Sequence, residues 1–224
     1  MCRRFSLSAD LNEVQEYFKI DTVLTYYRKR YNIAPTQDMA IIMQDGNERR
    51  LDQSRWGLFP FWGKDAINAD IDAVHRNPAY PKMIDRRRCI IPCNGFYYWR
   101  TVGKRSYPIR VVMKNRGIFG VAGLYENWRD TRGVEVRTCT LLMTNANTTV
   151  REFDSRMPAI LDEEGMEAWL DPNLRGVNNL RSYLRPHEDA RMDMYPVSPL
   201  LANDAFDTME CIQQMDMKMA WVKE

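Results

Sequence analysis

Hydrophobic and polar residues alternate along this chain in short runs, and most of these runs have the spacing of β-strands. Some of them are almost wholly apolar and others alternate with a period of two, as in buried and half-buried strands. We expect strands at four such runs, 39–43, 108–114, 118–125 and 137–144. Short strands of this kind are typical of an antiparallel sheet.

Helical spacing is less common in the chain. Over 9–20 the apolar residues fall on one face of a helix, and Ser8 stands before them as a candidate N-cap. Shorter helices are expected at 147–153 and at 163–170, the second of which ends before Pro172. Helices are therefore expected to be few.

A turn signal lies between two of the expected strands. Asn115, Arg116 and Gly117 separate the runs at 108–114 and 118–125, which predicts a hairpin with the glycine in the left-handed conformation. Strands outnumber helices, and no strand–helix–strand rhythm is present. We predict an α+β fold, in which residues 1–224 form a single compact domain with a curved, mainly antiparallel, barrel-like sheet and peripheral helices.

The composition agrees with one core in a soluble globular protein. The chain has 224 residues, of which 45% are hydrophobic and 28% charged. No apolar run is long enough to cross a bilayer and no secretory signal core is present, so we expect no membrane partner and a cytoplasmic location. Five cysteines are spread without pattern, which favours reduced thiols over a disulfide framework.

Charge is unevenly distributed, although the net charge is only +2. Residues 82–116 contain ten Lys or Arg and one acidic residue, a balance of +9, whereas 151–224 contain eight basic and fifteen acidic residues, a balance of −7. This asymmetry is consistent with a basic face that binds phosphates. It is equally consistent with a surface whose charges compensate one another.

The second residue of the chain carries candidate chemistry. If Met1 is removed, Cys2 presents an α-amine and a thiol on one residue. Their ordinary pKa values are about 8 and about 8.5, so both are partly reactive near neutral pH. A 1,2-aminothiol captures aldehydes through a Schiff base that the thiol closes to a thiazolidine. A cysteine at position 2 is, on its own, a weak signal.

Several common sites are absent from the sequence. There is no glycine-rich phosphate loop, so no nucleotide cofactor is expected. Cys89 and Cys93 have no second Cys or His pair beside them, which favours structural thiols over a metal site. Neither His75 nor His187 lies in a protease signature, and a Cys–His pair through His75 remains an unsupported alternative.

Eight short segments occur in the order and at the spacing of one protein family. They are Met1-Cys2-x-Arg4-Phe5, Tyr31-Asn32-Ile33-Ala34-Pro35-Thr36, Arg55-Trp56-Gly57-Leu58-x-Pro60-x-Trp62, Asn68-Ala69, Arg87-Arg88-Cys89-Ile90-Ile91-Pro92, Gly95-Phe96-Tyr97-x-Trp99, the run at 119–125 with Trp128, and Arg156-Met157-Pro158-Ala159-Ile160-Leu161. Together they resemble the SOS response-associated peptidase (SRAP) family, whose members shield abasic sites in single-stranded DNA. The resemblance covers about 2–198 and leaves the C-terminal remainder peripheral.

The resemblance implies a mechanism. Cys2 would attack the aldehyde of the ring-opened abasic site and form a thiazolidine DNA–protein crosslink, and Asn68 would orient the new ring. Arg4 and Arg156 would bind the phosphates that flank the lesion, because a guanidinium donates two hydrogen bonds to one phosphate. The implied partner is single-stranded DNA with an abasic site, bound by a monomer that is nucleoid-associated when on DNA.

Two further residues have open roles. Pro35 and Trp56 would support the bent strand or stack near unpaired bases. Trp56, like Trp62, could instead be a core aromatic, and Arg156 could pair with a carboxylate rather than with phosphate.

The chain departs from the family pattern at three positions. Tyr98 stands where the family has a glutamate, Asp154 where it has a histidine, and Asp70 where it has a phosphate-binding arginine. The first two substitutions remove the usual proton-transfer pair, which typically contributes about 10² to 10⁴ in rate. In this chain Tyr98 and Asp154 stand in the places of that glutamate and histidine. Three functions therefore stay open, an abasic-site crosslinking enzyme, a protein that binds damaged or single-stranded DNA without chemistry, and a thiol self-processing peptidase.

Overall fold

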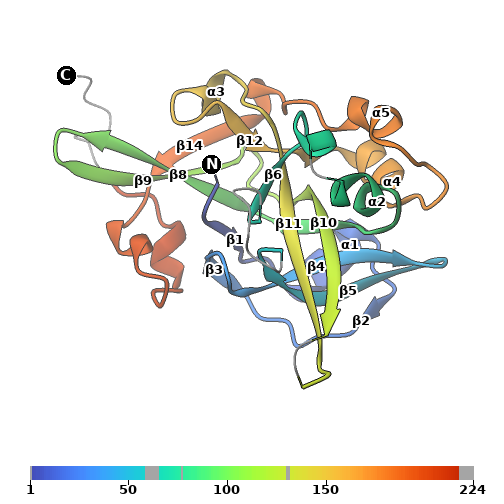
Figure 1. Ribbon diagram of the computed structural model, residues 1–224. Coiled ribbons are helices and arrows are strands. Elements are labelled where there is room, and N and C mark those ends of the chain that lie inside the picture. Colours follow the sequence, from blue (N-terminus) through green and yellow to red (C-terminus); the bar gives the residue numbers. More distant parts are fainter. Residues whose placement is uncertain (1, 59–65, 77, 130–131, 217–224) are drawn as a thin grey trace.

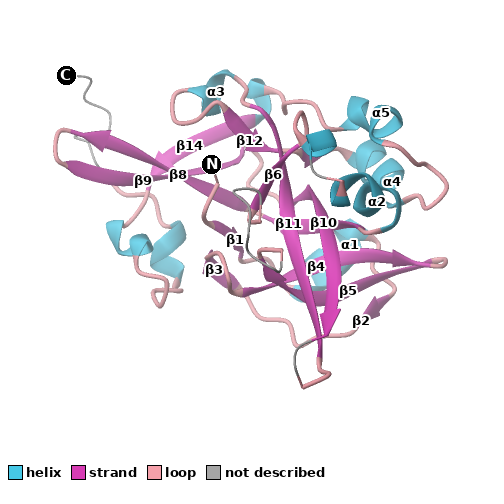
Figure 2. Ribbon diagram, in the orientation of Figure 1, coloured by secondary structure: helices cyan, strands magenta, loops and turns pink. Residues whose placement is uncertain are grey.

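The centre of the protein is a closed barrel of five strands. The computed structural model describes residues 2–58, 66–76, 78–129 and 132–216, and Figures 1 and 2 show the elements. The barrel strands are β4 (Asp38–Asp45), β5 (Glu48–Trp56), β7 (Arg88–Cys93), β10 (Phe119–Arg129) and β11 (Glu135–Asn145). They follow the order β11-β10-β7-β4-β5, and β5 then pairs in parallel with β11, with Cys139 opposite Trp56. Closure leaves the barrel without a free edge.

Short strands extend the barrel on its outside. β2 (Thr22–Val23) pairs with β5, β6 (Asn68–Asp70) and β12 (Arg156–Pro158) pair with β11, and β13 (Ile160–Leu161) pairs with β10. β6 is parallel to β11 and β12 is antiparallel to it. Residues from both short strands belong to the candidate site described below.

A second, antiparallel sheet packs against the barrel. Its order is β14 (Met192–Pro196), β9 (Arg105–Met113), β8 (Gly95–Val102), β1 (Phe5–Leu7) and β3 (Arg30–Ile33). The β8–β9 hairpin projects from the molecule in Figure 1, and Cys2, just before β1, lies against Asn68 of β6. β14 and β3 are the two edge strands of this sheet, and η5 of the C-terminal segment contacts β3.

The helices are short and lie at the periphery. The α-helices are α1 (Leu11–Phe18), α2 (Ala79–Arg86), α3 (Thr148–Arg151), α4 (Glu163–Leu170) and α5 (Val177–Leu180). The 3-10 helices are η1 (Val74–Arg76), η2 (Arg181–Tyr183), η3 (Asp189–Arg191), η4 (Pro199–Ala202) and η5 (Met209–Ile212). Among the described residues, no helix has the length and apolar character that crossing a membrane requires.

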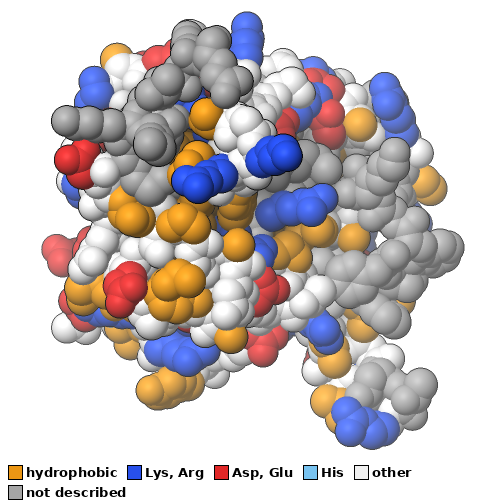
Figure 3. Space-filling model, turned by 90° about the vertical axis from the view of Figure 1, so that its left-hand side faces the viewer, with side chains coloured by type: hydrophobic (Ala, Val, Ile, Leu, Met, Phe, Trp, Pro, Cys, Tyr) orange, Lys and Arg blue, Asp and Glu red, His pale blue; other side chains and the backbone are white. Residues whose placement is uncertain are grey.

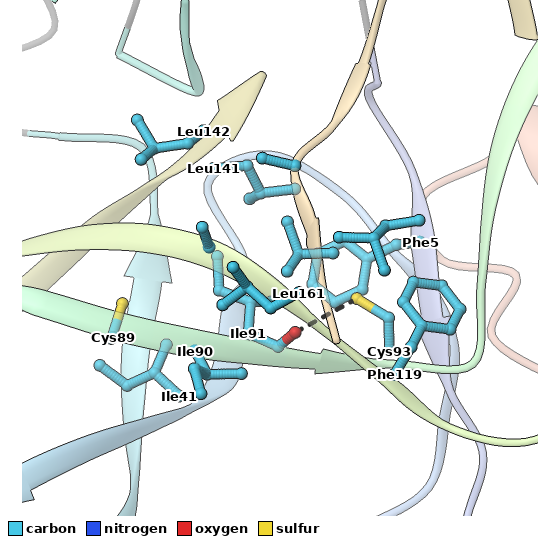
Figure 4. Close-up of a cluster of buried hydrophobic side chains, with 14 of the residues drawn as sticks. Phe5, Ile41, Cys89, Ile90, Ile91, Cys93, Phe119, Leu141, Leu142 and Leu161 are labelled. Atoms are coloured by element: carbon cyan, nitrogen blue, oxygen red, sulfur yellow. Dashed lines mark hydrogen bonds between the residues drawn. The ribbon is translucent and has the colours of Figure 1, made fainter. Parts of the chain in front are cut away.

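The main hydrophobic core fills the barrel and the space between the two sheets. Figure 4 shows part of it, in which Ile41 lies beside Ile90 and the same cluster includes Leu141, Phe119 and, from the second sheet, Phe5. These five side chains are at most 3% exposed. A core that joins both sheets agrees with the single compact α+β domain and the barrel-like antiparallel sheet predicted from the sequence.

Most of the predicted elements are confirmed. The strand runs at 39–43 and 137–144 lie within β4 and β11, and the helix at 163–170 is α4. α3 begins after Asn147, whose side chain accepts a hydrogen bond from the N–H of Val150. Local signals encode these elements, namely the spacing of the apolar residues that become buried and, for α3, a residue that caps the helix N-terminus.

The predicted hairpin around Gly117 is wrong. β9 pairs with β8 and β14 in the second sheet, whereas β10 pairs with β7 and β11 in the barrel. The left-handed residue of the connection is Arg116, with φ 59°, and not Gly117. The two strands exchange partners because each completes a different sheet, which local turn chemistry does not reveal.

The predicted cap of α1 is also wrong. The helix begins after Asp10, and the side chain of Asp10 makes no capping hydrogen bond. Ser8 instead accepts a hydrogen bond from the Asn94 side chain, 2.6 Å from Nδ2 to Oγ, in the loop between β7 and β8. A tertiary contact therefore occupies the hydroxyl that the sequence assigned to the helix.

Several arginines of the basic stretch at 82–116 are engaged within the protein. Arg88 and Arg110 are buried, and Arg100 and Arg116 form ion pairs with acidic residues elsewhere in the chain. On the face drawn in Figure 3, Lys and Arg side chains are scattered among acidic and hydrophobic ones. These arginines support the interpretation of a self-compensating surface.

Candidate active site

Cys2 lies in the interior of the molecule, just before β1. Its side chain is fully buried, and the thiol donates a hydrogen bond to the carbonyl of Arg4 at 3.4 Å. Burial raises the pKa of the Cys2 thiol to about 12, and backbone hydrogen bonds at Arg4 and Tyr97 oppose this rise without cancelling it. The thiol is therefore protonated at neutral pH and has to lose its proton during any nucleophilic step.

Asn68 is held directly against Cys2. β6 pairs with β11 so that Asn68 lies opposite Leu141, and its side chain is 2% exposed. Nδ2 of Asn68 donates to the carbonyl oxygen of Cys2 at 2.6 Å. Oδ1 is buried and has no hydrogen-bond partner within the described part of the chain. The amide thus fixes the backbone of Cys2 and keeps one acceptor unused.

Tyr98 lies on β8, near enough to Cys2 for a charge on Cys2 to affect its hydroxyl. Its hydroxyl donates to the carbonyl of Arg156 at 2.8 Å, and its ring stacks on Phe153 with centroids 5.9 Å apart. Burial raises the pKa of Tyr98 well above its ordinary value, and negative charge on Cys2 and Asp154 raises it further. Tyr98 is therefore a neutral hydrogen-bond donor that joins β8 to β12.

Asp154 lies between α3 and β12, where it is half-buried. Its Oδ1 accepts a hydrogen bond from the backbone N–H of Arg156 at 3.0 Å. Its negative charge raises the pKa values of both the Cys2 thiol and the Tyr98 hydroxyl, although burial has the larger effect on each. The four residues predicted as catalytic, Cys2, Asn68, Tyr98 and Asp154, are thus brought together from four separate parts of the chain.

Arg156 is neutralised by carboxylates of its own protein. At the start of β12 its guanidinium forms ion pairs with Asp70 and with Asp72, the latter at 2.9 Å, and donates to Oδ1 of Asn145 at 2.9 Å. Asp72 also pairs with Arg181. The structure thus has the carboxylate pairing that the sequence left open as the alternative to phosphate binding.

Arg4 has a comparable arrangement. One Nη atom forms an ion pair with Asp204, and the other donates to the carbonyl of Arg3 at 2.8 Å. Nε is buried without a hydrogen-bond partner among the described residues. The side chain lies two residues from the nucleophile, where a phosphate-binding group is expected, but an acidic residue already occupies it.

Trp56 belongs to the core and not to the surface. It is fully buried, its Nε1 donates to the carbonyl of Ile67 at 2.8 Å, and its ring meets the edge of Phe5 with centroids 5.1 Å apart. A base cannot stack on Trp56 in this conformation, so the predicted stacking role is excluded. The other predicted role, support of the bent DNA strand, could only be indirect, through packing beneath β1. Pro35 is half-buried in the turn after β3. Trp62 lies outside the described residues.

The remaining cysteines do not form a second site. Cys89 and Cys93 are buried in β7, and Cys93 donates to the carbonyl of Ile91 at 3.7 Å (Figure 4). Within the described residues, no group of three or more His, Cys, Asp or Glu side chains is placed to hold a metal ion. The imidazole of His75 lies outside the described side chains. Burial lowers the pKa of His187, which lines a different surface pocket.

The sequence interpretation missed Asp72 and Asp204, which together with Asp70 set the charge of the site. The Asp70-Ile71-Asp72 spacing was visible and placed two carboxylates near Asn68. For Asp204 the only signal was the acidic balance of the C-terminal part. Its partner Arg4 lies 200 positions earlier in the chain.

Comparison with known proteins agrees with this fold. The sequence model of the family described as SOS response associated peptidase (SRAP) matches residues 1–204. A match over that share of the chain identifies the class, and the chain belongs to the SRAP family.

Named relatives extend over nearly the whole chain. The chain is 36% identical over 222 residues to abasic site processing protein YoqW of Bacillus subtilis (strain 168), covering 95% of this chain and 99% of that protein. It is 28% identical over 229 residues to abasic site processing protein HMCES of Gallus gallus, covering 85% and 68% of the two chains.

Solved structures share the fold. A crystal structure of a protein from Bacteroides thetaiotaomicron has a TM-score of 0.82 and 26% identity, covering 96% of this chain and 100% of that one. A protein from Bordetella bronchiseptica has a TM-score of 0.76 at 21% identity, which shows the fold alone.

Proposed function

We propose that the protein recognises abasic sites in single-stranded DNA and, after removal of Met1, forms a thiazolidine crosslink through Cys2. Abasic-site recognition is supported by relatives that are named abasic site processing proteins. The observation that carries the crosslink is the buried hydrogen bond from Asn68 to the carbonyl of Cys2, at 2.6 Å. It fixes the one residue of the chain whose amine and thiol can both reach the same aldehyde carbon.

The proposed reaction needs no cofactor. The freed α-amine of Cys2 attacks the aldehyde of the ring-opened sugar, and loss of water gives a Schiff base. The sulfur then bonds to the imine carbon while the thiol proton passes to nitrogen. The products are one thiazolidine and one water molecule, and no electrons are gained or lost.

The surrounding residues have distinct roles in this scheme. The Asn68 amide orients Cys2, and its unused Oδ1 accepts a hydrogen bond from the amine or from the sugar hydroxyl. The Tyr98 hydroxyl already donates a hydrogen bond to the carbonyl of Arg156, which leaves Asp154 as the carboxylate near Cys2 that can carry protons. The resemblance would assign these steps to a glutamate and a histidine, so we expect a slower reaction here.

A second candidate is DNA binding without chemistry. It is favoured by the Cys2 thiol, whose pKa is raised to about 12 by burial, and by the Tyr98 and Asp154 substitutions. The two candidates differ in one product, the covalent adduct.

The test is incubation of the purified protein with a single-stranded oligonucleotide carrying one abasic site, followed by heating and a denaturing gel. Intact mass first establishes whether Met1 has been removed. Wild type and Cys93→Ser are expected to give a heat-stable adduct, because Cys93 is a core thiol on β7, whereas Cys2→Ser is expected to give none. An undiminished adduct with Cys2→Ser would exclude Cys2 as the nucleophile. Retarded mobility in native gels without any adduct, in protein that lacks Met1, would favour binding alone.

A further inference from the structure

The C-terminal segment packs against the edge of the second sheet, close to the candidate site. η4 and η5 lie beside β9 and β3, and in Figure 1 they form the orange-red group below the β8–β9 hairpin. Leu201 and Cys211 are fully buried in a small second core with Tyr97 and Val197. The segment is thus a folded part of the domain, and through Asp204 it reaches Arg4, two residues after Cys2.

Asp207 anchors this segment at the free edge of β3. One carboxylate oxygen accepts hydrogen bonds from the backbone N–H groups of Tyr31 and Asn32, at 2.6 and 2.9 Å, and the other oxygen pairs with Arg30. The Asp207 side chain is only 18% exposed. Backbone amides combined with a guanidinium are also the donors that bind phosphate groups. Asp207 therefore fills an anion site on this edge with a carboxylate from the chain itself.

Asn32 secures the backbone of the same segment. Its Nδ2 lies within hydrogen-bond distance of the carbonyls of Leu201, Asn203 and Phe206, at 2.9 to 3.1 Å. Asn32 is fully buried. The loop that carries Asp204 is consequently held on both sides of that residue.

Asp204 is held much more weakly than Asp207. Its carboxylate pairs with Arg4, and this is the one ion pair or hydrogen bond that the carboxylate makes among the described residues. The side chain is 60% exposed, so it can turn into solvent without disturbing the anchored loop. Exposed ion pairs of this kind contribute little stability. A phosphate could displace it at small cost.

We propose that residues 203–207 form an acidic strap in which Asp204 occupies the phosphate position on Arg4, so that single-stranded DNA must displace it. The proposal rests on the proposed function, since it assigns Arg4 to phosphate binding beside Cys2. The charge of the segment agrees with it, because residues 199–216 contain four acidic residues and no basic one. Asp207 keeps the strap in place while Asp204 exchanges.

Competition of this kind has a characteristic salt dependence. DNA that binds Arg4 releases counterions, but the freed Asp204 carboxylate attracts a cation and offsets part of that release. Removing the Asp204 charge should therefore steepen the dependence of affinity on salt, by up to about 0.7 in the logarithmic slope for single strands. A merely structural Asp204 would leave the slope unchanged.

The experiment measures binding of an undamaged single-stranded oligonucleotide to the full chain at several salt concentrations. Asp204→Asn keeps the shape and removes the charge, and Glu210→Gln is the matched control, an exposed acidic residue on the same segment. We expect Asp204→Asn to bind about three- to fivefold tighter at low salt, with a steeper slope. Glu210→Gln is expected to change affinity by less than about 1.5-fold, since a general charge effect on exposed residues is largely screened.

A second pair of variants isolates Arg4. In the Arg4→Ala background, Asp204→Asn should have no further effect, because the group for which DNA and strap compete is gone. Equal gains from Asp204→Asn with and without Arg4, or no gain at all in a protein that crosslinks abasic DNA, would overturn the strap and leave the proposed function intact. A wild type that neither binds nor crosslinks abasic single strands, with Asp204→Asn equally inactive, would overturn both.

Discussion

The candidate site has a buried part, formed by Cys2 and Asn68 and here called the floor, and a charged part, formed by Arg4, Arg156 and their carboxylate partners and here called the rim. The two parts are built in opposite ways. On the floor, Cys2 and Asn68 are buried and meet through one short hydrogen bond, and Asn68 keeps an acceptor unused. On the rim, Arg4 and Arg156 are the side chains proposed to bind phosphates, but carboxylates of the protein already pair with both of them. The floor thus keeps one hydrogen-bond acceptor unused, whereas the guanidinium groups of the rim are already paired with carboxylates.

This difference separates chemistry from binding. Residues on the floor should control how fast a bound aldehyde reacts, and they should do so with little dependence on salt. Residues on the rim should control how tightly a charged strand is held, because any phosphate has to displace Asp70, Asp72 or Asp204. The two regions adjoin, because Arg4 follows Cys2 closely in the chain and the carbonyl of Arg156 accepts a hydrogen bond from Tyr98. Their side chains are separate, so each region can be altered by its own substitutions.

The largest effect is expected for Asn68→Ala. Loss of the hydrogen bond to the Cys2 carbonyl frees the nucleophile to shift, and small misplacements of reacting groups cost up to about 10²-fold in rate. We expect crosslinking at saturating protein to slow by roughly tenfold to a hundredfold, as measured by single-turnover gels. Asn94→Ala is the control, because it removes a different amide, which bonds Ser8. An unchanged rate in Asn68→Ala would remove this residue from the mechanism.

A smaller gain is expected from restoring the proton-transfer pair. Tyr98→Glu with Asp154→His should accelerate crosslink formation or reversal by about tenfold, a part of the 10² to 10⁴ that general acid–base groups supply. The measurement is the rate of adduct formation and of adduct loss, together with the melting temperature, since Tyr98 is buried against Phe153. If a folded double variant has the same rates as wild type, the residue-by-residue comparison with the family fails at these positions.

A change of affinity is expected at Asp70. Asp70→Arg should tighten single-strand binding by about fivefold at low salt, and the gain should shrink as salt rises because the Debye length is about 10 Å at 0.1 M. Asp70→Asn should give a smaller gain through release of Arg156. Asparagine can still accept the hydrogen bond that Asp70 Oδ1 receives from the N–H of Asp72. Equilibrium binding that is the same in all three proteins would return Asp70 and Arg156 to a purely structural role.

The smallest effect concerns alkaline stability. The folded state raises the pKa of the buried Cys2 thiol from 9.0 to about 12. The unfolded chain therefore loses this proton first, and stability falls as pH rises above 9. Between pH 9 and 10 the loss approaches about 1 kcal/mol for one such group. Cys2→Ala should show a shallower decline in denaturant midpoint over this interval. An identical decline in both proteins would mean that the thiol is not buried as described.

The sequence was sufficient for the parts of the fold that depend on local pattern. The strand at 39–43 and the helix at 163–170 follow from apolar spacing. The contact between Cys2 and Asn68 joins two of the short motifs on which the candidate catalytic positions were predicted. The hairpin at Gly117 failed because the choice between two sheets is made by distant partners.

The rim could not be predicted for the same reason. Asp204 is 200 positions from Arg4, and Asp72 is 84 positions from Arg156. Which carboxylate neutralises which arginine depends on how the C-terminal segment and β6 pack, and residue types alone do not encode this. The sequence did identify both arginines and raised the possibility that Arg156 pairs with a carboxylate.

The separation of floor and rim is tested most directly by single-turnover crosslinking to an abasic single strand at increasing protein concentration. Wild type is compared with a variant that carries Asp70→Asn and Asp204→Asn. The account predicts that the protein concentration giving half-maximal rate falls several-fold in the variant while the maximal rate stays the same. A changed maximal rate with an unchanged half-maximal concentration would contradict it, because the rim carboxylates would then act on the chemistry and not on binding.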